Sequence, residues 1–595
     1  MTEVSLSDVS LSDVSLSDVS LSDLFERQVR RTPDACAIEH GEGALTYAEL
    51  LRHSTALAAE LQAAGVGLEH VVGLDLPVGP RLVAAMLAAG RLGAAFLPLD
   101  QRDPRSRRDH LLADARPAAV VLQDGLLAPD APPQRLLDRV PRVASTAAYL
   151  NYTSGSTGEP KGVVNEQHAI VNYIEAAIAE YRLAPADRQL QFSSIAFDIA
   201  LEEVFTALGS GATLVLRDED FRYEDVEDFL RLVDERGLTV VNLPTGVWNQ
   251  LGRALRQVPH VRLPAAVRLM IIGGEAAGPD AAEAWHAAAV HPDFRIVNTY
   301  GPTEAAVAVS FAELTAGGPV TIGRPIRGVG LVAVDADLRT VPDGEIGELL
   351  ISGIAPARGY LDRPDETAAR FGTTADGAEG RWFRTGDLGR VRPDGLIEFR
   401  GRADDQVKVR GGFRVEPGEV VNALLTHPGL VEAAVLPVDL GVGRALAAFV
   451  VAVDAAAPPR AADLRDHLAA RLPDFMVPAS FTPVAAIPLT DRGKVDAAVL
   501  RALLSEVRSR PEPSGSVADA VRESWAAALG GEPEDESADF FDDGGDSVAA
   551  VEFLGQLRAR LGQAPPLREL YRAPRFGDVV RQLTQDPADA SVTAA

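Results

Sequence analysis

The stretch Thr153-Ser-Gly-Ser-Thr-Gly-Glu-Pro-Lys161-Gly162 carries the strongest signal in the sequence. Its glycines let the backbone approach a ligand closely, and its hydroxyl groups and single ammonium add donors for phosphate oxygens. Because it lacks the Gly-Lys-Ser/Thr ending of a Walker A loop, it predicts a phosphate-binding loop of another kind. The alternative is a mobile, Gly/Ser-rich surface loop without a ligand.

Lysine is rare in this chain, which gives the lysine of the loop more weight. Three of the 57 basic residues are lysines, Lys161, Lys408 and Lys494, and the others are arginines. A chain that otherwise favours arginine is expected to keep lysine where a compact ammonium is needed. Each of the three lies beside glycine or in an alternating strand pattern, so we expect functional roles for them; chance survival is the alternative.

The composition indicates a globular enzyme and excludes several other classes. The chain has 595 residues, enough for roughly three to five domains, with 47% hydrophobic residues. A net charge of −28 argues against nucleic-acid binding, and the single cysteine, Cys36, excludes a disulfide framework or a Cys-based metal site. We find no apolar run long enough for a membrane span and no secretory signal, so we expect a cytoplasmic protein that does not bind membranes.

The order of sequence patterns predicts several domains. Residues 4–23 are four copies of Val-Ser-Leu-Ser-Asp, a polar repeat whose period fits neither helix nor strand, so we expect disorder there. Alternating strand and helix patterns follow and predict α/β layers with largely parallel sheets. The expected strands are 71–76, 94–99, 118–122, 213–216, 239–243, 269–272 and 295–298, and the expected helices include 81–92, 224–236 and 281–290. The predicted division is a disordered segment at 1–23, an α/β core at 24–403, a small α+β domain at 404–507, a linker at 508–516, a helical domain at 517–585 and a tail at 586–595.

Further motifs lie before and after the phosphate loop, in a fixed order. They are Leu45-Thr-Tyr-Ala-Glu-Leu50, Gly93-Ala-Ala-Phe-Leu-Pro-Leu-Asp100, Phe197-Asp198, Asn298-Thr-Tyr-Gly-Pro-Thr-Glu304, Gly347-Glu-Leu, Ala357-Arg-Gly-Tyr360, Arg384-Thr-Gly-Asp387, Gly401-Arg-Ala-Asp-Asp-Gln-Val-Lys-Val-Arg-Gly411, Leu472-Pro-Asp-Phe-Met-Val-Pro478, Gly493-Lys-Val-Asp496 and Asp539-Phe-Phe-Asp-Asp-Gly-Gly-Asp-Ser547. With the loop they resemble the motifs of the acyl-adenylate-forming superfamily, and the last resembles the carrier-protein motif. Over nearly its whole length after the repeat, the chain resembles a nonribosomal peptide synthetase adenylation domain fused to one peptidyl carrier domain.

The resemblance implies a fold, cofactors and a modification site. The expected fold is a large α/β adenylation core, a small α+β subdomain on a hinge at Asp404, and an all-α carrier bundle. The expected cofactors are ATP, Mg²⁺ and 4′-phosphopantetheine, the last attached to Ser547 by a phosphopantetheinyl transferase. Ser547 precedes an apolar helical pattern, so a plain helix N-cap is the alternative. The eight acids among residues 531–546 would suit docking to a basic modifying enzyme.

The resemblance also implies an ATP site. Asp387 is expected to accept both ribose hydroxyls, Arg402 to hold the nucleotide and Tyr300 to stack on adenine. A turn aspartate, a surface arginine and a core aromatic are the alternatives, and Phe399 stands where many members have tyrosine. The full predicted ATP site is Thr153, Ser154, Gly155, Ser156, Thr157, Gly158, Lys161, Gly274, Glu275, Asn298, Thr299, Tyr300, Gly301, Asp387, Phe399 and Arg402.

For catalysis the resemblance points to a lysine and a Thr-Glu pair. Lys494 is expected to neutralise the charge that develops when the substrate carboxylate attacks the α-phosphorus. Thr303 and Glu304 are expected to contact the phosphates and Mg²⁺, with Glu304 as the metal-linked carboxylate; an acid that complements a helix dipole is the alternative. Rotation about Asp404 is expected to exchange the Lys494 loop for the strand of Lys408 during thioester formation, although Asp404 could be a plain turn residue.

The predicted substrate pocket contains two acidic residues. Asp198 is expected to pair with a substrate ammonium, which implies an amino acid; the other positions are Ile199, Glu202, Gly246, Ile271, Gly273, Thr299, Val307, Ala308 and Lys494. Glu202 follows Asp198 by one helical turn and is an acid additional to the usual Glu203. Because a buried carboxylate without a partner is costly, we expect a diamino acid, namely lysine, β-lysine or ornithine. The alternative is that Glu202 faces an internal arginine or solvent.

The resemblance also implies partner proteins, and several other functions remain as alternatives. Free-standing adenylation–carrier pairs of this kind resemble those that supply β-lysine in tuberactinomycin-type antibiotic pathways. A condensation domain or acyltransferase in trans is the expected downstream partner, and an MbtH-like protein is a further candidate. The alternatives are a ligase for a neutral amino acid, an acyl- or aryl-CoA ligase, and a non-catalytic scaffold. Asp198 and Ser547 argue against a CoA ligase, and Lys161, Asp387 and Lys494 argue against a scaffold.

Overall fold

The computed structural model forms two compact units, Met1–Glu416 and Pro417–Ala595, which are considered separately. It describes residues 19–41, 43–127, 145–154, 159–217, 225–373, 380–403, 407–409, 413–439, 444–454, 458–488, 495–508, 516–529, 532–533, 535–541, 547–561, 564–565 and 567–584. Within these ranges, no helix combines the length and the hydropathy that crossing a membrane would require.

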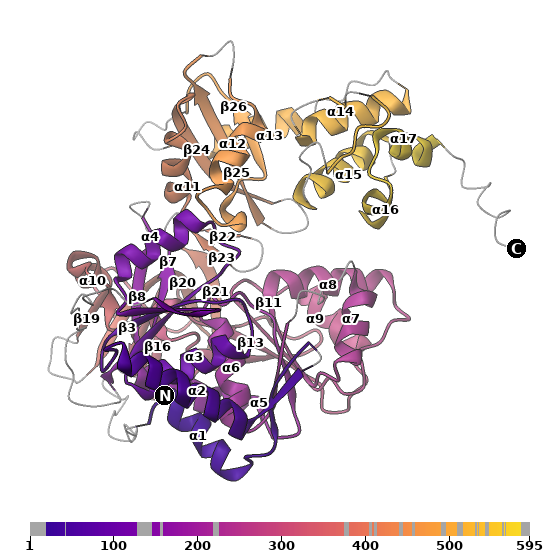
Figure 1. The fold of residues 1–595 in the computed structure, drawn as a ribbon. Coiled ribbons are helices and arrows are strands. Elements are labelled where there is room, and N and C mark those ends of the chain that lie inside the picture. Colours follow the sequence, from indigo (N-terminus) through magenta and orange to yellow (C-terminus); the bar gives the residue numbers. More distant parts are fainter. Residues whose placement is uncertain are drawn as a thin grey trace, which may run out of the picture. The chain divides into compact units, whose positions relative to one another are not determined.

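Two large sheets form the framework of the first unit (Figure 1). In the described residues, one has the order β15 (Arg324–Pro325), β14 (Ser310–Leu314), β13 (Arg295–Tyr300), β12 (Leu269–Gly273), β11 (Val240–Pro244), β9 (Arg188–Gln191), β10 (Thr213–Leu216), β1 (Cys36–His40), β2 (Gly43–Thr46). The other has the order β18 (Gly359–Tyr360), β8 (Lys161–Glu166), β7 (Ala147–Thr153), β4 (Ala95–Leu99), β3 (Val71–Asp75), β5 (Ala119–Leu122), β6 (Gly125–Leu127). The inner pairs are parallel and antiparallel pairs lie toward the edges, so the predicted α/β layers and all the predicted strands are confirmed.

Amphipathic helices cover these sheets. They are α1 (Leu21–Arg31), α2 (Tyr47–Ala63), α3 (Pro80–Arg91), α4 (Arg105–Ala115), α5 (Gln167–Tyr181), α6 (Ile199–Ser210), α7 (Val226–Glu235), α8 (Thr245–Gln257), α9 (Pro279–Ala288) and α10 (Pro364–Arg370). Figure 1 shows α7, α8 and α9 beside β11, and buried Trp248 and Trp285 join these helices to the strands in one apolar core. The predicted helices at 81–92, 224–236 and 281–290 are α3, α7 and α9.

The end of the polar repeat belongs to the fold. Ser20 caps α1 by accepting the backbone N–H of Asp23, whose carboxylate accepts the backbone N–H of Ser20 in return, a capping box. Leu21 is 2% and Phe25 1% exposed. Disorder was therefore the wrong expectation for residues 19–23, because the last repeat copy supplies both a helix cap and core side chains. Residues 1–18 lie outside the described residues.

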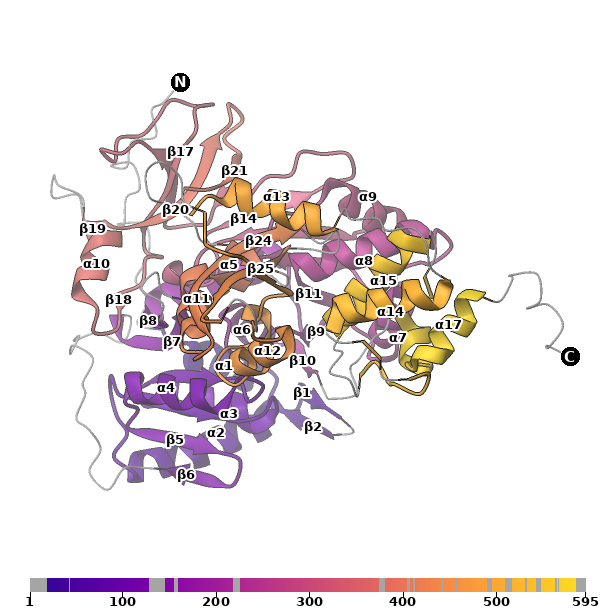
Figure 2. The ribbon, with the colours of Figure 1, turned by 90° about the horizontal axis from the view of Figure 1, so that it is seen from above.

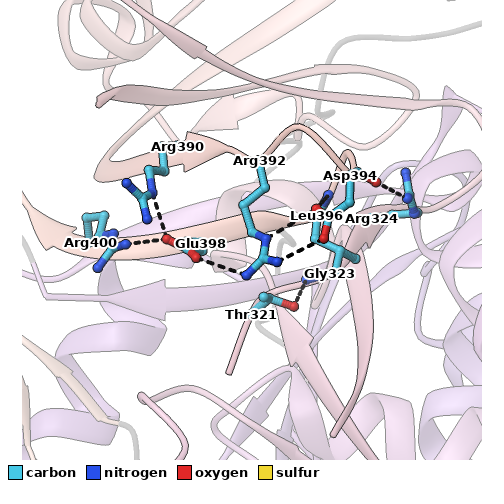
Figure 3. Close-up of polar contacts among 9 residues, drawn as sticks. All are labelled: Thr321, Gly323, Arg324, Arg390, Arg392, Asp394, Leu396, Glu398 and Arg400. Carbon is cyan, nitrogen blue, oxygen red and sulfur yellow. Dashed lines mark hydrogen bonds and ion pairs between the residues drawn. The ribbon is translucent and has the colours of Figure 1, made fainter. Parts of the chain in front are cut away.

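A third sheet in the first unit contains the Arg384-Thr-Gly-Asp387 motif. Its order is β16 (Val329–Val334), β17 (Gly347–Gly353), β20 (Arg381–Val391), β19 (Phe371–Thr373), and β21 (Ile397–Arg402) pairs with β20. Figure 3 shows the guanidiniums of Arg390, Arg392 and Arg400 around the carboxylate of Glu398. These ion pairs tie one end of the β20–β21 ladder, whose other end pairs Asp387 with Arg402.

The first compact unit extends past the predicted boundary at residue 404. A short hairpin, β22 (Val407–Val409) and β23 (Phe413–Val415), belongs to it. The ring of Phe413 lies 4.6 Å from that of Phe197, and Val409 is buried. These contacts group the hairpin with the unit that carries Asp198. The expected hinge, Asp404, lies outside the described residues.

The second unit contains the predicted small α+β domain and the helical domain. The first comprises α11 (Pro417–Leu425), β24 (Leu430–Asp439), β25 (Arg444–Ala452), α12 (Ala461–Ala469), β26 (Ser480–Pro483) and α13 (Ala497–Arg508). The helical domain comprises α14 (Val517–Leu529), α15 (Ser547–Leu561), α16 (Leu567–Arg572) and α17 (Phe576–Thr584), seen in yellow in Figures 1 and 2. Trp525 is fully buried against Phe540, Phe553 and Phe576, which fixes this all-α core.

Candidate functional site

Asp387 lies at the centre of a buried polar cluster built from three strands. It is 2% exposed, and its Oδ1 accepts a hydrogen bond from Arg402 at 2.7 Å. Its Oδ2 accepts one from the Tyr300 hydroxyl, also at 2.7 Å. Burial and the charge of Asp387 raise the pKa of Tyr300 well above its usual value, so the tyrosine remains a donor. The ring of Phe399 lies 6.2 Å from that of Tyr300, so these four predicted ATP residues lie together.

The phosphate loop is described at its two ends. Thr153 ends β7 and Lys161 begins β8, and the two residues pair across the ladder. Gly155, Ser156, Thr157 and Gly158 lie outside the described residues. The Lys161 ammonium is 4.3 Å from the centre of the Tyr360 ring and 3.5 Å from the Glu366 carboxylate, in a nearly buried position.

Thr303 and Glu304 lie in a strained turn. They begin a 3₁₀ turn, Thr303–Ala305, and Glu304 is fully buried. Ala306 and Val307 follow with φ of 53° and 75°, a conformation that is costly for a β-branched residue and typical of functional sites. A Cβ on Gly301 would lie 2.4 Å from the Cα of Ala308, so the turn also requires glycine there.

The two predicted pocket acids lie one helical turn apart, as expected. Asp198 stands at the N-cap position of α6 but makes no side-chain capping bond; its Oδ2 is buried without a hydrogen-bond partner, and burial raises its pKa to about 6. Glu202 is fully buried; its Oε1 accepts the Tyr181 hydroxyl at 2.7 Å, while its Oε2 has no hydrogen-bond partner. Burial raises the pKa of Glu202 to about 7, with a contribution from the charge of Asp198, and the hydroxyls of Tyr181 and Tyr173 oppose that rise.

Glu203 is bonded quite differently from its neighbour. Its carboxylate accepts the backbone N–H groups of Phe192 and Ser193 and the Ser193 hydroxyl. Burial raises its pKa to about 8. Every Glu203 oxygen therefore has a partner within the protein, whereas Glu202 retains an orphaned oxygen. The side-chain amide of Asn242, on β11, is likewise buried without a hydrogen-bond partner.

The other predicted pocket positions gather at the ends of neighbouring strands. Gly273 and Thr299 pair across β12 and β13, and a Cβ on Gly273 would lie 2.3 Å from the Thr299 hydroxyl. Thr245, adjacent to Gly246 at the start of α8, donates its hydroxyl to the Gly273 carbonyl at 2.8 Å. Ile271 is buried on β12, and Asn298, on β13, donates to the Thr321 carbonyl at 2.8 Å. Ile199 begins α6, Val307 and Ala308 are buried, and Gly274 and Glu275 follow β12.

The β22–β23 hairpin reaches this region. The backbone N–H of Glu416, which follows the hairpin, donates to the Ser154 hydroxyl at 3.1 Å. With the Phe197–Phe413 contact, this places the strand of Lys408 next to the phosphate loop and the pocket. Lys494 lies outside the described residues. Ser547 begins α15, as predicted, and its side chain lies outside the described part of the structure.

Several site residues were missed from the sequence. Tyr173 and Tyr181 are on α5 and face Glu202 on α6, although no local motif joins the two helices. Their spacing of eight residues does place both on one helix face, which was the available signal. Tyr360 lies in a quoted motif, but no role was derived for it; its hydroxyl donates to Glu304 at 2.8 Å.

The residues present fit ATP and Mg²⁺. Each oxygen of Asp387 has a second lone pair beyond its bond to Arg402 or Tyr300, enough to accept two ribose hydroxyls. Glu304 offers the hard oxygen that Mg²⁺ prefers. Because the described residues hold no group of three or more potential ligand residues, phosphate oxygens and water would complete the coordination of the metal.

Comparison with known proteins identifies the family of each part of the chain. Residues 25–361 match the family model of AMP-binding enzymes, residues 419–494 that of the AMP-binding enzyme C-terminal domain, and residues 519–583 that of the phosphopantetheine attachment site. Novobiocin biosynthesis protein H of Streptomyces niveus is 37% identical over 89% of this chain and 90% of its own length. One of the linear gramicidin synthase proteins of Brevibacillus parabrevis is 36% identical over 94% of this chain, which spans 7% of that protein.

A solved structure has the same overall architecture. It is holo-PA1221, a nonribosomal peptide synthetase protein with adenylation and carrier domains, bound to a vinylsulfonamide inhibitor; it aligns with a TM-score of 0.74 at 24% identity, over 95% of this chain and 96% of its own. The likeness confirms the fold. The carrier match implies modification by a phosphopantetheinyl transferase. The chain belongs to the AMP-binding enzymes, as an ATP-dependent, amino-acid-adenylating ligase of the nonribosomal peptide synthetases joined to its own peptidyl carrier domain.

Proposed function

We propose that this ligase activates a diamino acid, namely lysine, β-lysine or ornithine, and loads it on its own carrier domain. The observation that carries the proposal is the buried Oε2 of Glu202, which has no hydrogen-bond partner. Glu202 lies one helical turn from Asp198. A buried carboxylate in this state is costly unless a cation joins it. A substrate whose α- or β-ammonium meets Asp198 and whose distal ammonium meets Glu202 supplies that cation.

The neighbours of Glu202 support the same assignment. Tyr181 occupies one of its oxygens, and Tyr173 and Asn242 add polar atoms around it; besides burial, these three residues and Asp198 make the largest contributions to its pKa. A neutral substrate side chain would leave Glu202 Oε2 and the Asn242 amide buried without hydrogen-bond partners. A terminal ammonium can donate three hydrogen bonds, to the carboxylate and to the oxygens beside it.

The proposed reaction follows from the assigned residues. Asp198 holds the substrate ammonium, which directs the substrate carboxylate toward the phosphates. A carboxylate oxygen of the substrate bonds to the α-phosphorus. The bond between the α-phosphorus and the bridging oxygen breaks, and pyrophosphate leaves with the electron pair of that bond. Lys494 and Lys161 neutralise charge during this step, and Asp387 holds the ribose. A phosphopantetheine arm held by Ser547 would supply the thiol that accepts the aminoacyl group and releases AMP, and the β22–β23 hairpin lies next to the phosphate loop for this step.

Glu202→Gln tests the substrate class. The amide keeps the size and the Tyr181 contact but removes the charge, so kcat/KM for the preferred diamino acid is expected to fall about 10- to 100-fold, the range for a lost charged hydrogen bond. Exchange with norleucine, which has the length of lysine without the ammonium, is expected to stay equal or rise. The measurement is amino-acid-dependent ATP–pyrophosphate exchange with lysine, β-lysine, ornithine, arginine and norleucine.

Glu180→Gln is the matched control for this substitution. Glu180 is a partly exposed acid on α5 that pairs with Arg295, so its loss is expected to leave the substrate preference unchanged. A wild-type enzyme that prefers norleucine over every diamino acid, or a Glu202→Gln variant with unaltered preference, would contradict the diamino-acid proposal. Adenylation itself would still stand.

The pH dependence of substrate binding gives a separate test. Burial raises the pKa of Glu202 to about 7, and the distal ammonium binds only its ionised form. The KM for a diamino acid is therefore expected to rise as the pH falls below about 7, approaching tenfold per unit, and to level off above it. For Glu202→Gln the rise should begin lower, near the pKa of about 6 of Asp198. Initial exchange rates between pH 5.5 and 8.5 measure both profiles.

A further inference from the structure

A tyrosine contacts the phosphate-loop lysine and the expected metal carboxylate at once. Tyr360 is 6% exposed; its hydroxyl donates to Glu304 Oε1 at 2.8 Å, and the Lys161 ammonium lies over its ring, 4.3 Å from the centre. We propose that Tyr360 is a positioning residue that sets the spacing of Lys161 and Glu304 for binding MgATP. The inference rests on the proposed assignment of Lys161 to the phosphates and Glu304 to Mg²⁺.

The backbone holds Tyr360 independently of its side chain. Strand β18 pairs with β8, with Tyr360 opposite Val163, and the Leu361 N–H donates to the Gly162 carbonyl at 2.8 Å. The Ala357 N–H donates to the Glu304 carbonyl at 2.9 Å. The same segment is therefore tied by main-chain bonds to the phosphate-loop strand and to the turn of Glu304. Substitution of the side chain leaves these bonds in place.

The two contacts act on different properties of the bound nucleotide. The hydroxyl bond orients the buried Glu304 carboxylate and so sets the direction from which its oxygens can meet a metal ion. The ring holds the Lys161 ammonium by its face, beside the Glu366 carboxylate at 3.5 Å, and so fixes the place at which this charge can meet phosphate oxygens. Because the ring is rigid, the Tyr360 side chain fixes the distance between the Lys161 ammonium and the Glu304 carboxylate. In the proposed site both groups act on the same triphosphate.

Tyr360→Phe separates the two contacts. The ring and its cation–π contact remain, but Glu304 loses its hydroxyl donor. We expect the Mg²⁺ concentration that half-saturates ATP binding to rise about tenfold, and the affinity at saturating Mg²⁺ to stay within about threefold. Tyr360→Leu removes both contacts and should also weaken ATP binding at saturating Mg²⁺. Isothermal titration calorimetry of the full chain with ATP, at fixed Mg²⁺ concentrations from 0.1 to 10 mM, measures both quantities.

Tyr152→Phe is the matched control. The Tyr152 hydroxyl donates to Asp114 at 2.7 Å, so this variant also loses one tyrosine–carboxylate bond on a strand next to β8. It is expected to keep the wild-type dependence on Mg²⁺. An unchanged Mg²⁺ dependence in Tyr360→Phe, or the same shift in Tyr152→Phe, would overturn the proposal. Because ATP binding is measured without an amino acid, the result does not depend on the diamino-acid assignment.

Discussion

Asp387→Asn is expected to lower kcat/KM for ATP about 10²- to 10³-fold, because two charged hydrogen bonds to the ribose lose their acceptor charge. The substitution also places an amide NH₂ group against either Arg402 or Tyr300, both of which donate to Asp387. The side chain of Arg402 is only 11% exposed, and in this variant its charge would lose the Asp387 carboxylate as its partner. ATP–pyrophosphate exchange at varied ATP measures the effect.

Asp394→Asn is the control for this prediction. Asp394 lies in the exposed turn between β20 and β21 and pairs with Arg392 at 2.9 Å (Figure 3). The hairpin thus loses one carboxylate charge in either variant, but only Asp387 faces Tyr300 and Arg402. A KM for ATP that rises equally in both variants, or in neither, would refute the ribose assignment.

Arg358→Ala is expected to destabilise the first unit by about 3–5 kcal/mol, the usual cost of leaving a buried carboxylate unpaired. Glu69 is fully buried, and its two oxygens accept from the Arg358 guanidinium at 2.8 and 2.9 Å. Arg358 also pairs with Glu166 at 2.9 Å. Burial alone would lower the pKa of Arg358, but the two carboxylates raise it above its ordinary value.

Urea unfolding of the full chain, followed through tryptophan fluorescence, tests this value; Trp248, Trp285 and Trp382 of the four tryptophans lie in the first unit. Arg339→Ala is the control, because the pair of Arg339 and Asp337 is largely exposed and is expected to contribute less than about 1 kcal/mol. The double variant Arg358→Met/Glu69→Gln should recover part of the loss, since neither charge remains buried alone. Equal losses in Arg358→Ala and Arg339→Ala would contradict the argument.

The sequence predicted the layers well, and it selected residues that the fold brings together, for a physical reason. Buried parallel strands are continuous apolar runs, so 269–272, Leu-Met-Ile-Ile, was recognisable as β12. Asp387, Tyr300 and Arg402 were found because each lies in a short motif whose chemistry is local. Their convergence from three strands on one carboxylate could come only from the fold.

The contacts of Glu202 and Tyr360 join elements that no local sequence pattern links. Tyr181 reaches Glu202 from another helix, and Tyr360 reaches Glu304 through a strand of two residues, too short for any periodicity to show. The start of α1 was missed for the opposite reason. Ser20 and Asp23 do form a capping pattern, but the same residues recur three times upstream. The repeat was judged as a whole by its polar composition, and the last copy, which precedes a core helix, was not considered separately.

The capping box at Ser20 has a consequence for how this protein tolerates change in length. Each five-residue copy in residues 4–23 contains the same Ser-Leu-Ser-Asp, so a deletion or duplication of whole copies leaves an identical cap and identical Leu21 and Ser22 positions in front of Leu24. Replication errors in units of fifteen nucleotides therefore keep both the reading frame and the first helix intact. The number of repeat copies can therefore change between generations without changing the sequence from the helix cap onward.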